Sequence, residues 1–305
     1  MFESVNRIAY LTLQIHDNSS STFRLGARTL VRLRFGMKTL LTVAIALTAS
    51  VTFAQEDSPQ PPKHIDISAL PSTAKVVDDV VVPVPTEVFG VLDKLGSPNW
   101  HEVLRSVKTD TLGERPQVAL LLGTVIAEGF IAVEAQEPEE VKRIGRDVLN
   151  LAGAIGVRKS VIARTSSIIE AADQKDWKRI RTELDGALQD VKQAMIELKD
   201  EQLAQLVSLG GWLRGTEALT QVVGKNYSKD GAELLHQPVL LSYFNKRLDS
   251  MEGRLKKNEL VKKIRSKLSE LTPMIDEQQT ISAKNVEEIH SITEDLVKSI
   301  SAQES

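Results

Sequence analysis

The sequence has 305 residues, of which 42% are apolar and 26% are charged, and its net charge is −3. These proportions are close to the averages of soluble globular proteins, so they exclude a chain that is disordered throughout and one that crosses a membrane many times. Residues 1–54 carry six cations and two anions, which leaves a net charge of about −7 on the remainder and opposes non-specific binding to nucleic acid.

The first 54 residues predict a signal for export. A basic start at Met37 precedes an apolar stretch of about a dozen residues, and the small residues Thr52 and Ala54 stand where a signal peptidase cuts. The alternative is an uncleaved anchor, but the stretch is shorter than the ~20 residues that span a bilayer. We therefore expect cleavage after Ala54, a periplasmic protein and no stable membrane span after cleavage. Residues 1–36 are either a long basic leader or the result of a start codon placed too early.

The sequence contains no cysteine. The exported protein therefore has neither a disulfide framework nor a cysteine that could carry a lipid at its new N-terminus. A cysteine-free chain of this size fits a bacterial envelope better than a eukaryotic secretory route, where disulfides are common. We expect a soluble protein of the bacterial envelope.

Residues 55–85 predict an extended leader in front of the folded part. Residues 55–74 are rich in Pro and Ser. Residues 75–85 are β-branched and interrupted by proline, which predicts one short strand or an extended segment lying over the domain. We place a helical core domain at 86–252 and a looser C-terminal helical tail at 253–305.

The rest of the sequence predicts an all-α fold, an irregular bundle of about eight helices around one central apolar helix. We expect the central helix at 115–136, where Glu128 is the only charge between Val118 and Val133. Apolar residues at spacings of three and four, with Pro, Ser and Gly near the ends, predict the other helices. Their expected ranges are 87–95, 98–108, 138–155, 158–172, 176–198, 200–224, 231–236, 238–252, 258–271 and 284–300.

Small residues predict a close crossing of two helices. Gly211 and Gly215 are four residues apart, and Gly123 and Ala127 have the same spacing on the central helix. Small side chains on facing sides let two helix backbones approach each other. We expect Gly211 and Gly215 to pack against Gly123 and Ala127 in such a crossing, in preference to lining a ligand slot.

Arg214 lies between these two glycines, close to Trp212. Arg214 and Glu217 are three residues apart and can pair on one helix face, which would neutralise a cation in the interior. If they do not pair, Arg214 and Trp212 become candidates for binding an anionic ligand.

Two Glu-x-x-His pairs suggest a metal site as an alternative. Such pairs have the spacing that di-iron carboxylate bundles use on two of their helices, with single glutamates on two more. The pairs are Glu233 with His236 and Glu287 with His290. The glutamates that could complete the set are Glu128 with Glu134 or Glu170. Because glutamate is abundant in this chain, chance explains the spacing better than a metal does.

The sequence contains no phosphate-binding loop, dinucleotide fingerprint, serine-hydrolase elbow or zinc-protease motif. We therefore expect a non-enzymatic binding or structural module without a cofactor, whose partner is an unknown protein or small-molecule ligand in the periplasm. Two alternatives stay open. One is a metal-dependent helical-bundle enzyme or metal store, and the other is a carrier of apolar ligands.

Overall fold

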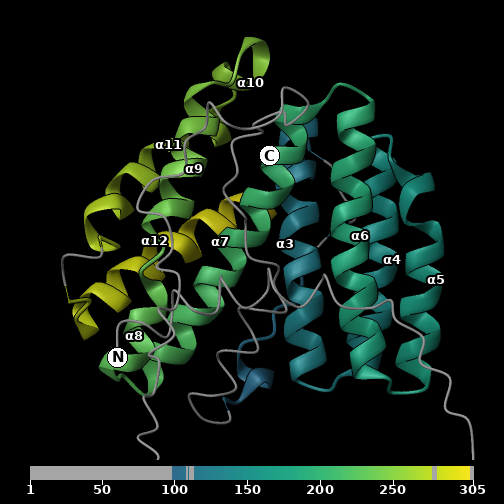
Figure 1. Cartoon of the computed structure of the whole chain (residues 1–305), viewed down its shortest axis with the longest axis horizontal. Coiled ribbons are helices and arrows are strands. Elements are labelled where there is room, and N and C mark those ends of the chain that lie inside the picture. The colour runs from purple at the N-terminus through teal and green to yellow at the C-terminus, as the bar shows by residue number, and fades with distance from the viewer. Residues whose placement is uncertain (1–97, 108, 110–112, 277–279, 303–305) are drawn as a thin grey trace, which may run out of the picture. The chain divides into compact units, whose positions relative to one another are not determined.

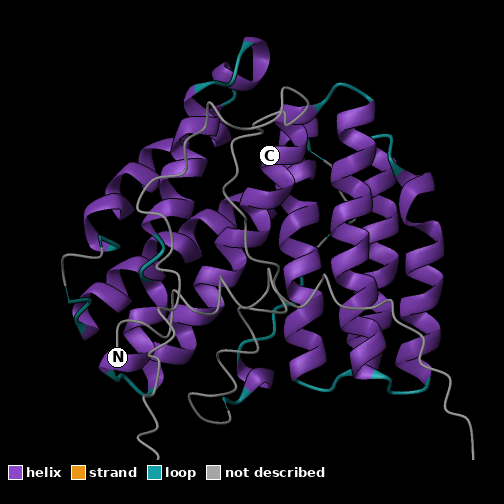
Figure 2. Ribbon diagram, viewed as in Figure 1, coloured by secondary structure: helices purple, strands orange, loops and turns teal. Residues whose placement is uncertain are grey.

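The computed structural model describes residues 98–107, 109, 113–276 and 280–302 (Figure 1). The chain divides into two units, Met1–Leu70 and Pro71–Ser305, and every described residue belongs to the second. The expected signal segment, the leader and the helix at 87–95 lie outside the described residues. Within the described ranges every regular element is a helix, which confirms the expected all-α fold (Figure 2).

Eight of the described α-helices have twelve residues or more. They are α3 (Arg115–Glu134), α4 (Pro138–Ala154), α5 (Arg158–Asp173), α6 (Trp177–Glu197), α7 (Glu201–Lys225), α9 (Pro238–Asp249), α11 (Glu259–Leu271) and α12 (Ala283–Ser301). The shorter elements are α8 (Lys229–Ala232), α10 (Gly253–Lys257) and the 3-10 turns η3 (Trp100–Glu102), η4 (Glu233–Leu235) and η5 (Thr272–Met274). The long helices fall on the ranges that apolar spacing predicts, whereas the sequence does not predict α10.

Helix α3 is the central helix, as its apolar run predicts. Every residue from Val118 to Val133 is buried, Glu128 included. By length and composition α3 could cross a membrane, but 89% of its most apolar stretch is buried inside the fold. A helix that is apolar on all sides and covered by other helices is the core helix of a bundle.

Two groups of helices pack around α3. On one side α3, α4, α5 and α6 form a four-helix bundle, in which each helix packs on the next and α6 packs back on α3 (Figure 1). On the other side α7 packs along α3, and α12 packs on both. Helix α9 packs on α7, and α11 joins α9 to α12. Ile264 of α11 and Leu296 of α12 belong to the same core as α3, while the domain boundary at residue 253 stays a prediction.

The first five long helices are joined by four turns of one kind. After each helix two successive amides donate to carbonyls of its last turn, and the first of the two residues has a positive φ. These residues are Gln136 (57°), Gly156 (89°), Lys175 (54°) and Lys199 (59°). Only glycine adopts this conformation without a steric cost, so three of the four turns carry some backbone strain. Because the turns are tight, each helix runs antiparallel to the one before it.

Helices α3 and α7 approach each other closely at glycines. A Cβ added to Gly123 would overlap a carbonyl oxygen of α7, and a Cβ added to Gly210 would overlap a carbonyl oxygen of α3. Gly211 also faces Gly123, but Gly215 has open space where its Cβ would lie. The predicted contact is therefore right for Gly123 and Gly211 and wrong for Gly215. The crossing spans about one turn of each helix, and Gly215 lies a turn beyond it.

Candidate functional site

Residues 98–107, which we call the strap, lie on the bundle without forming the helix that Ser97 and Pro98 predict. The one regular element in residues 98–107 is the 3-10 turn η3. Trp100, Val103 and Val107 are buried in the core. Main-chain hydrogen bonds within the strap end at Leu104, and the carbonyl of Val103 and the amide of Arg105 bind side chains of α7 and α3 instead, so the predicted helix is wrong.

Arg214 and Glu128 hold the middle of the strap from the interior. Arg214 Nη2 donates to the carbonyl oxygen of Val103 at 2.6 Å, and Arg214 Nε donates to Glu128 Oε2 at 2.6 Å. The other carboxylate oxygen of Glu128 accepts from the amide nitrogen of Arg105 at 2.5 Å. The side chains of Arg214 and Glu128 are 0% and 1% exposed. The single charge between Val118 and Val133 of α3 thus has one partner on α7 and another on the strap.

This pair is the centre of a larger set of charges, which we call the ionic network. The network comprises Arg105, Glu128, Arg214, Glu217, Glu294 and Lys298. Arg214 Nη1 lies 3.4 Å from Glu217 Oε2, so the pairing expected on α7 is present. Arg105 forms ion pairs with Glu217 and, at 3.1 Å, with Glu294, which also pairs with Lys298 at 3.1 Å. Three cations face three anions, so the network is balanced in charge.

The two glutamates that pair with Arg105 have pKa values shifted in opposite directions. Burial raises the pKa of the Glu217 carboxyl above its ordinary value of 4.5, and the attraction of Arg214 and Arg105 opposes this rise. The hydrogen bond from Lys298 lowers the pKa of Glu294, and Arg105 lowers it further. Burial therefore opposes the charged form of the carboxyl at the interior end of the network, whereas the cations at the outer end stabilise the charged form.

His290 joins α12 to α7 beside the ionic network. Its Nδ1 lies 3.1 Å from the hydroxyl of Thr220, and that hydroxyl donates its proton to the carbonyl oxygen of Glu217 at 2.8 Å. A hydroxyl has one proton to give, so His290 Nδ1 is the donor in the first of these bonds. The contact fixes α12 against α7 at the level of Glu217.

Contacts nearer the surface hold the first part of the strap. Gln221 Nε2 donates to the carbonyl oxygen of Glu102 at 2.9 Å, and Lys225 forms an ion pair with the Glu102 carboxylate. His101 Nδ1 lies 3.2 Å from Glu137 Oε1, and both side chains are exposed. Exposed ion pairs contribute about 0–1 kcal/mol each. The strap is therefore fixed mainly through its buried middle.

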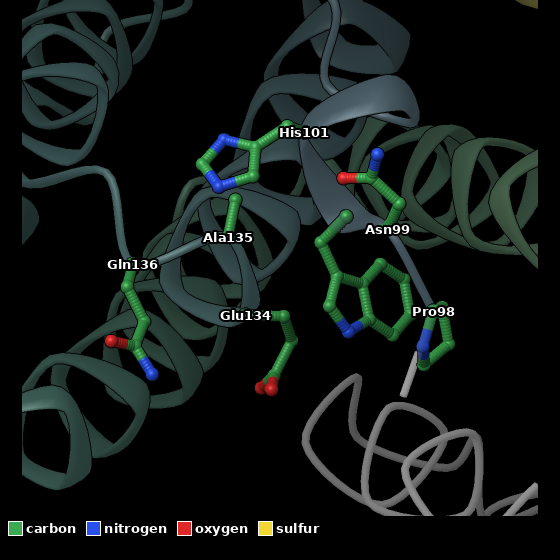
Figure 3. A pocket seen from close by; sticks show the side chains of 7 residues that line it. Pro98, Asn99, His101, Glu134, Ala135 and Gln136 are labelled. Atoms are coloured by element: carbon green, nitrogen blue, oxygen red, sulfur yellow. The ribbon is translucent and has the colours of Figure 1, made fainter. Parts of the chain in front are cut away.

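Two open hollows flank the strap at the corner between α3 and α4. The larger has a volume of about 430 Å³, with Asn99 and His101 on the strap side and Glu134 and Gln136 on the α3 side (Figure 3). The smaller has a volume of about 310 Å³. Its lining residues are Leu104, Arg105, Ser106, Glu137 and Glu140. Charged and polar side chains line both hollows, whereas sites for apolar ligands are lined mostly by apolar ones.

The residues of the alternative metal site lie apart from one another. Glu233 and His236 are neighbours on and after η4, with 3.4 Å between Oε2 and Nδ1. His290 binds a threonine of α7, Glu287 is exposed and Glu128 belongs to the ionic network. The remaining candidates, Glu134 and Glu170, pair with arginines of α6. In the part of the chain that the structure describes, no group of three or more His, Cys, Asp or Glu side chains could hold a metal ion.

Arg214 and Trp212 take part in separate contacts of α7. Each of the three guanidinium nitrogens of Arg214 binds a protein group. Trp212 Nε1 donates to Gln237 Oε1 at 2.8 Å, and its ring centre lies 5.4 Å from that of Phe244 of α9. The sequence suggested an anion site only if Arg214 and Glu217 did not pair, and they do pair. Trp212 packs against a different part of the fold.

Four residues that hold the strap or belong to the ionic network are not apparent from the sequence: Arg105, Gln221, Glu294 and Lys298. Arg105 lies in a segment whose pattern resembles a helix, and its partner Glu294 is 189 residues away in the chain. One signal was available. A glutamate alone in an apolar helix needs a buried cation or donor, so Glu128 could have directed attention to Arg214.

No protein-family model matches the chain, and no curated protein or solved structure matches it either. The functional interpretation therefore rests on the residues of the chain itself, and above all on the contacts between the strap and the ionic network.

Proposed function

We propose that the protein is an exported, non-enzymatic binding module of the bacterial envelope. The ionic network is the observation that carries this proposal. Its charged groups bind one another and the strap, so the most polar part of the interior holds a segment of chain in place. A network that holds a segment of chain in place supports a binding role more directly than a catalytic one.

The location follows from the N-terminal sequence. The apolar stretch after Met37, the small residues up to Ala54 and the lack of cysteine support export to a bacterial periplasm. There the folded part would bind an unknown protein or small-molecule partner without a cofactor. The negative charge of the chain beyond residue 54 argues against nucleic acid as that partner.

Isolation of the protein from its native cells tests both parts of the proposal. We expect it in the soluble envelope fraction, with Gln55 as its first residue by mass, and in a discrete complex of constant stoichiometry after gentle cross-linking. A cytoplasmic protein that begins at Met1 or Met37 would exclude the envelope role. A protein that carries no partner under these conditions would exclude the binding role.

The same sample decides between the proposal and its alternatives. Elemental analysis that shows about two transition-metal ions per chain, lost in His236→Ala, would replace it with a metal-dependent bundle enzyme or metal store. Apolar small molecules that co-purify at constant stoichiometry, detected by mass spectrometry, would replace it with an apolar-ligand carrier.

A further inference from the structure

The strap packs against three helices, and we call the surface that it covers on them the groove. Glu128 is on α3, Arg214 is on α7 and Glu294 is on α12. Their partners in the strap are 23, 111 and 189 residues away in the chain. The strap is therefore bound by groups that are remote from it in sequence, as a peptide is bound by a receptor.

Three of these contacts reach the main chain of the strap. Two successive strap carbonyls accept hydrogen bonds from Gln221 and Arg214, and one strap amide donates to Glu128. Contacts to main-chain atoms are available to any segment that follows the same backbone course, whatever its side chains. Grooves that bind peptides use such contacts for affinity and use pockets for individual side chains to select a sequence.

The side chains of the strap supply that second kind of contact. Trp100, Val103 and Val107 are buried in the core, and Ser106 between them is exposed. Arg105 pairs with two carboxylates of the groove. A segment with an aromatic residue, an aliphatic residue three positions later and an arginine two positions after that would occupy the same places.

Without Arg105 the groove would hold more negative than positive charge. Glu128, Glu217 and Glu294 would then face Arg214 and Lys298 alone. A carboxylate without a partner is costly to bury, so the groove requires a cation from its occupant. Arginine suits this place because its planar guanidinium can bind two carboxylates at once.

We propose that this groove is a peptide-binding site, closed in this structure by the strap of the same chain, and that its partner is a protein segment of the Trp-x-x-Val-x-Arg type that adopts the same turn as the strap. The strap is then an autoinhibitory segment that must leave before the partner binds. This inference rests on the proposed function as a binding module and adds the site and the chemistry of the partner. Because the strap is tethered, it competes at an effective concentration of about a millimolar, which lowers the apparent affinity for the partner.

A labelled synthetic peptide of residues 98–107 tests the proposal by fluorescence anisotropy, with the full chain purified after export. Two variants loosen the strap. Arg105→Ala removes the ion pairs with Glu217 and Glu294. Glu102→Lys, at an exposed position, places a second cation beside Lys225, which repels the strap. Arg115→Ala is the matched control, because it removes a surface ion pair away from the groove.

We expect Arg105→Ala and Glu102→Lys to bind the peptide about ten-fold more tightly than the wild type and the control do. A peptide with alanine in place of its arginine should bind about ten-fold more weakly. Circular dichroism shows whether each variant is folded, and Glu102→Lys leaves the buried charges in place if Arg105→Ala does not fold. No saturable binding to a folded strap variant, or equal binding of the two peptides, would overturn the proposal.

Two further outcomes are decisive. A wild-type dimer that the peptide dissociates, seen by light scattering, would assign the groove to the strap of a second copy and overturn the assignment to a partner segment. If the peptide fails to bind but the cross-linked envelope complex is found, the groove is wrong and the proposed function stands. If the complex is absent too, the proposed function also fails.

Discussion

Arg214 Nε and Glu128 Oε2 meet 2.6 Å apart across two helices, and neither side chain is in contact with water. A charge buried this deeply costs several kcal/mol unless it is paired and hydrogen-bonded. Each residue therefore makes the burial of the other tolerable, and together they join α3, α7 and the strap at one point.

Removal of the cation should destabilise the fold strongly. Arg214→Met leaves Glu128 and Glu217 buried without it, and we expect a loss of about 3–5 kcal/mol in the free energy of unfolding, measured in urea. The double variant with Glu128→Gln should lose less than the sum of the two single losses, because the partners are coupled. Arg146→Met, on the surface, should change stability by about 0.5 kcal/mol or less. A loss below about 1 kcal/mol in Arg214→Met would contradict a buried pair.

The raised pKa of Glu217 predicts a dependence of stability on pH. The folded protein binds this proton more tightly than the unfolded chain does. The contribution of Glu217 is therefore fully present below its ordinary pKa of 4.5 and is lost as the pH rises through the folded value. Relative to Glu217→Gln, the wild type should lose unfolding free energy as the pH rises above 4.5, as urea unfolding at a series of pH values would show.

The lowered pKa of Glu294 predicts the opposite dependence of stability on pH. Its folded pKa is lowered, so its contribution is present above 4.5 and is lost as the pH falls through the folded value. Relative to Glu294→Gln, the wild type should lose unfolding free energy as the solution becomes more acidic. If the difference in unfolding free energy between the wild type and each variant changed with pH in the same direction for both, the two glutamates would not have pKa values shifted in opposite directions.

The glycines of the α3–α7 crossing should respond differently from their neighbour. Gly123→Ala and Gly210→Ala place a methyl group against backbone atoms that cannot move aside, which should cost about 1–3 kcal/mol or more. Gly215→Ala meets open space and should stabilise the helix by up to about 1 kcal/mol. Thermal unfolding followed by circular dichroism measures the three. A lower melting temperature for Gly215→Ala would place that residue in the crossing after all.

The repeated turns between helices offer a stabilising change. Lys175 is exposed and has a φ of 54°, so Lys175→Gly should relieve a backbone cost and raise the free energy of unfolding by about 1 kcal/mol. Gly156 occupies the equivalent place after α4 with a φ of 89°, and Gly156→Ala should lower stability by a similar amount. Differential scanning calorimetry of the pair provides the check, and changes of equal sign would show that the two turns are not equivalent.

Local sequence was sufficient for the long described helices and insufficient for the strap. The spacing of apolar residues such as Ile180, Leu184 and Val191 places α6, because periodicity reports directly which face is buried. The same reasoning predicts a helix at the strap, where Pro98 favours a helix start. Long-range contacts decide against it, since Arg214 and Glu128 take the main-chain groups that a helix would use internally.

The candidate site was predictable only where its partners are close in sequence. Arg214 and Glu217 are three residues apart, so their pairing follows from helix geometry. Arg105 could not be assigned in this way, because nothing in the residues around it indicates Glu217 or Glu294. Gly215 illustrates a related limit: small-residue spacing finds a face that can approach another helix, but the crossing angle determines which turn of that face makes the contact.

Among the described elements, Glu294 lies on the last helix, α12, and Arg105 lies before the first long helix, α3. A chain that leaves a ribosome or a membrane channel N-terminus first can form the local pairs α3 to α6 early. The groove that binds the strap then lacks the contribution of α12 until that helix has emerged. The ionic network is therefore complete only when α12 has formed, because Arg105 of the strap takes one of its two carboxylate partners from that helix.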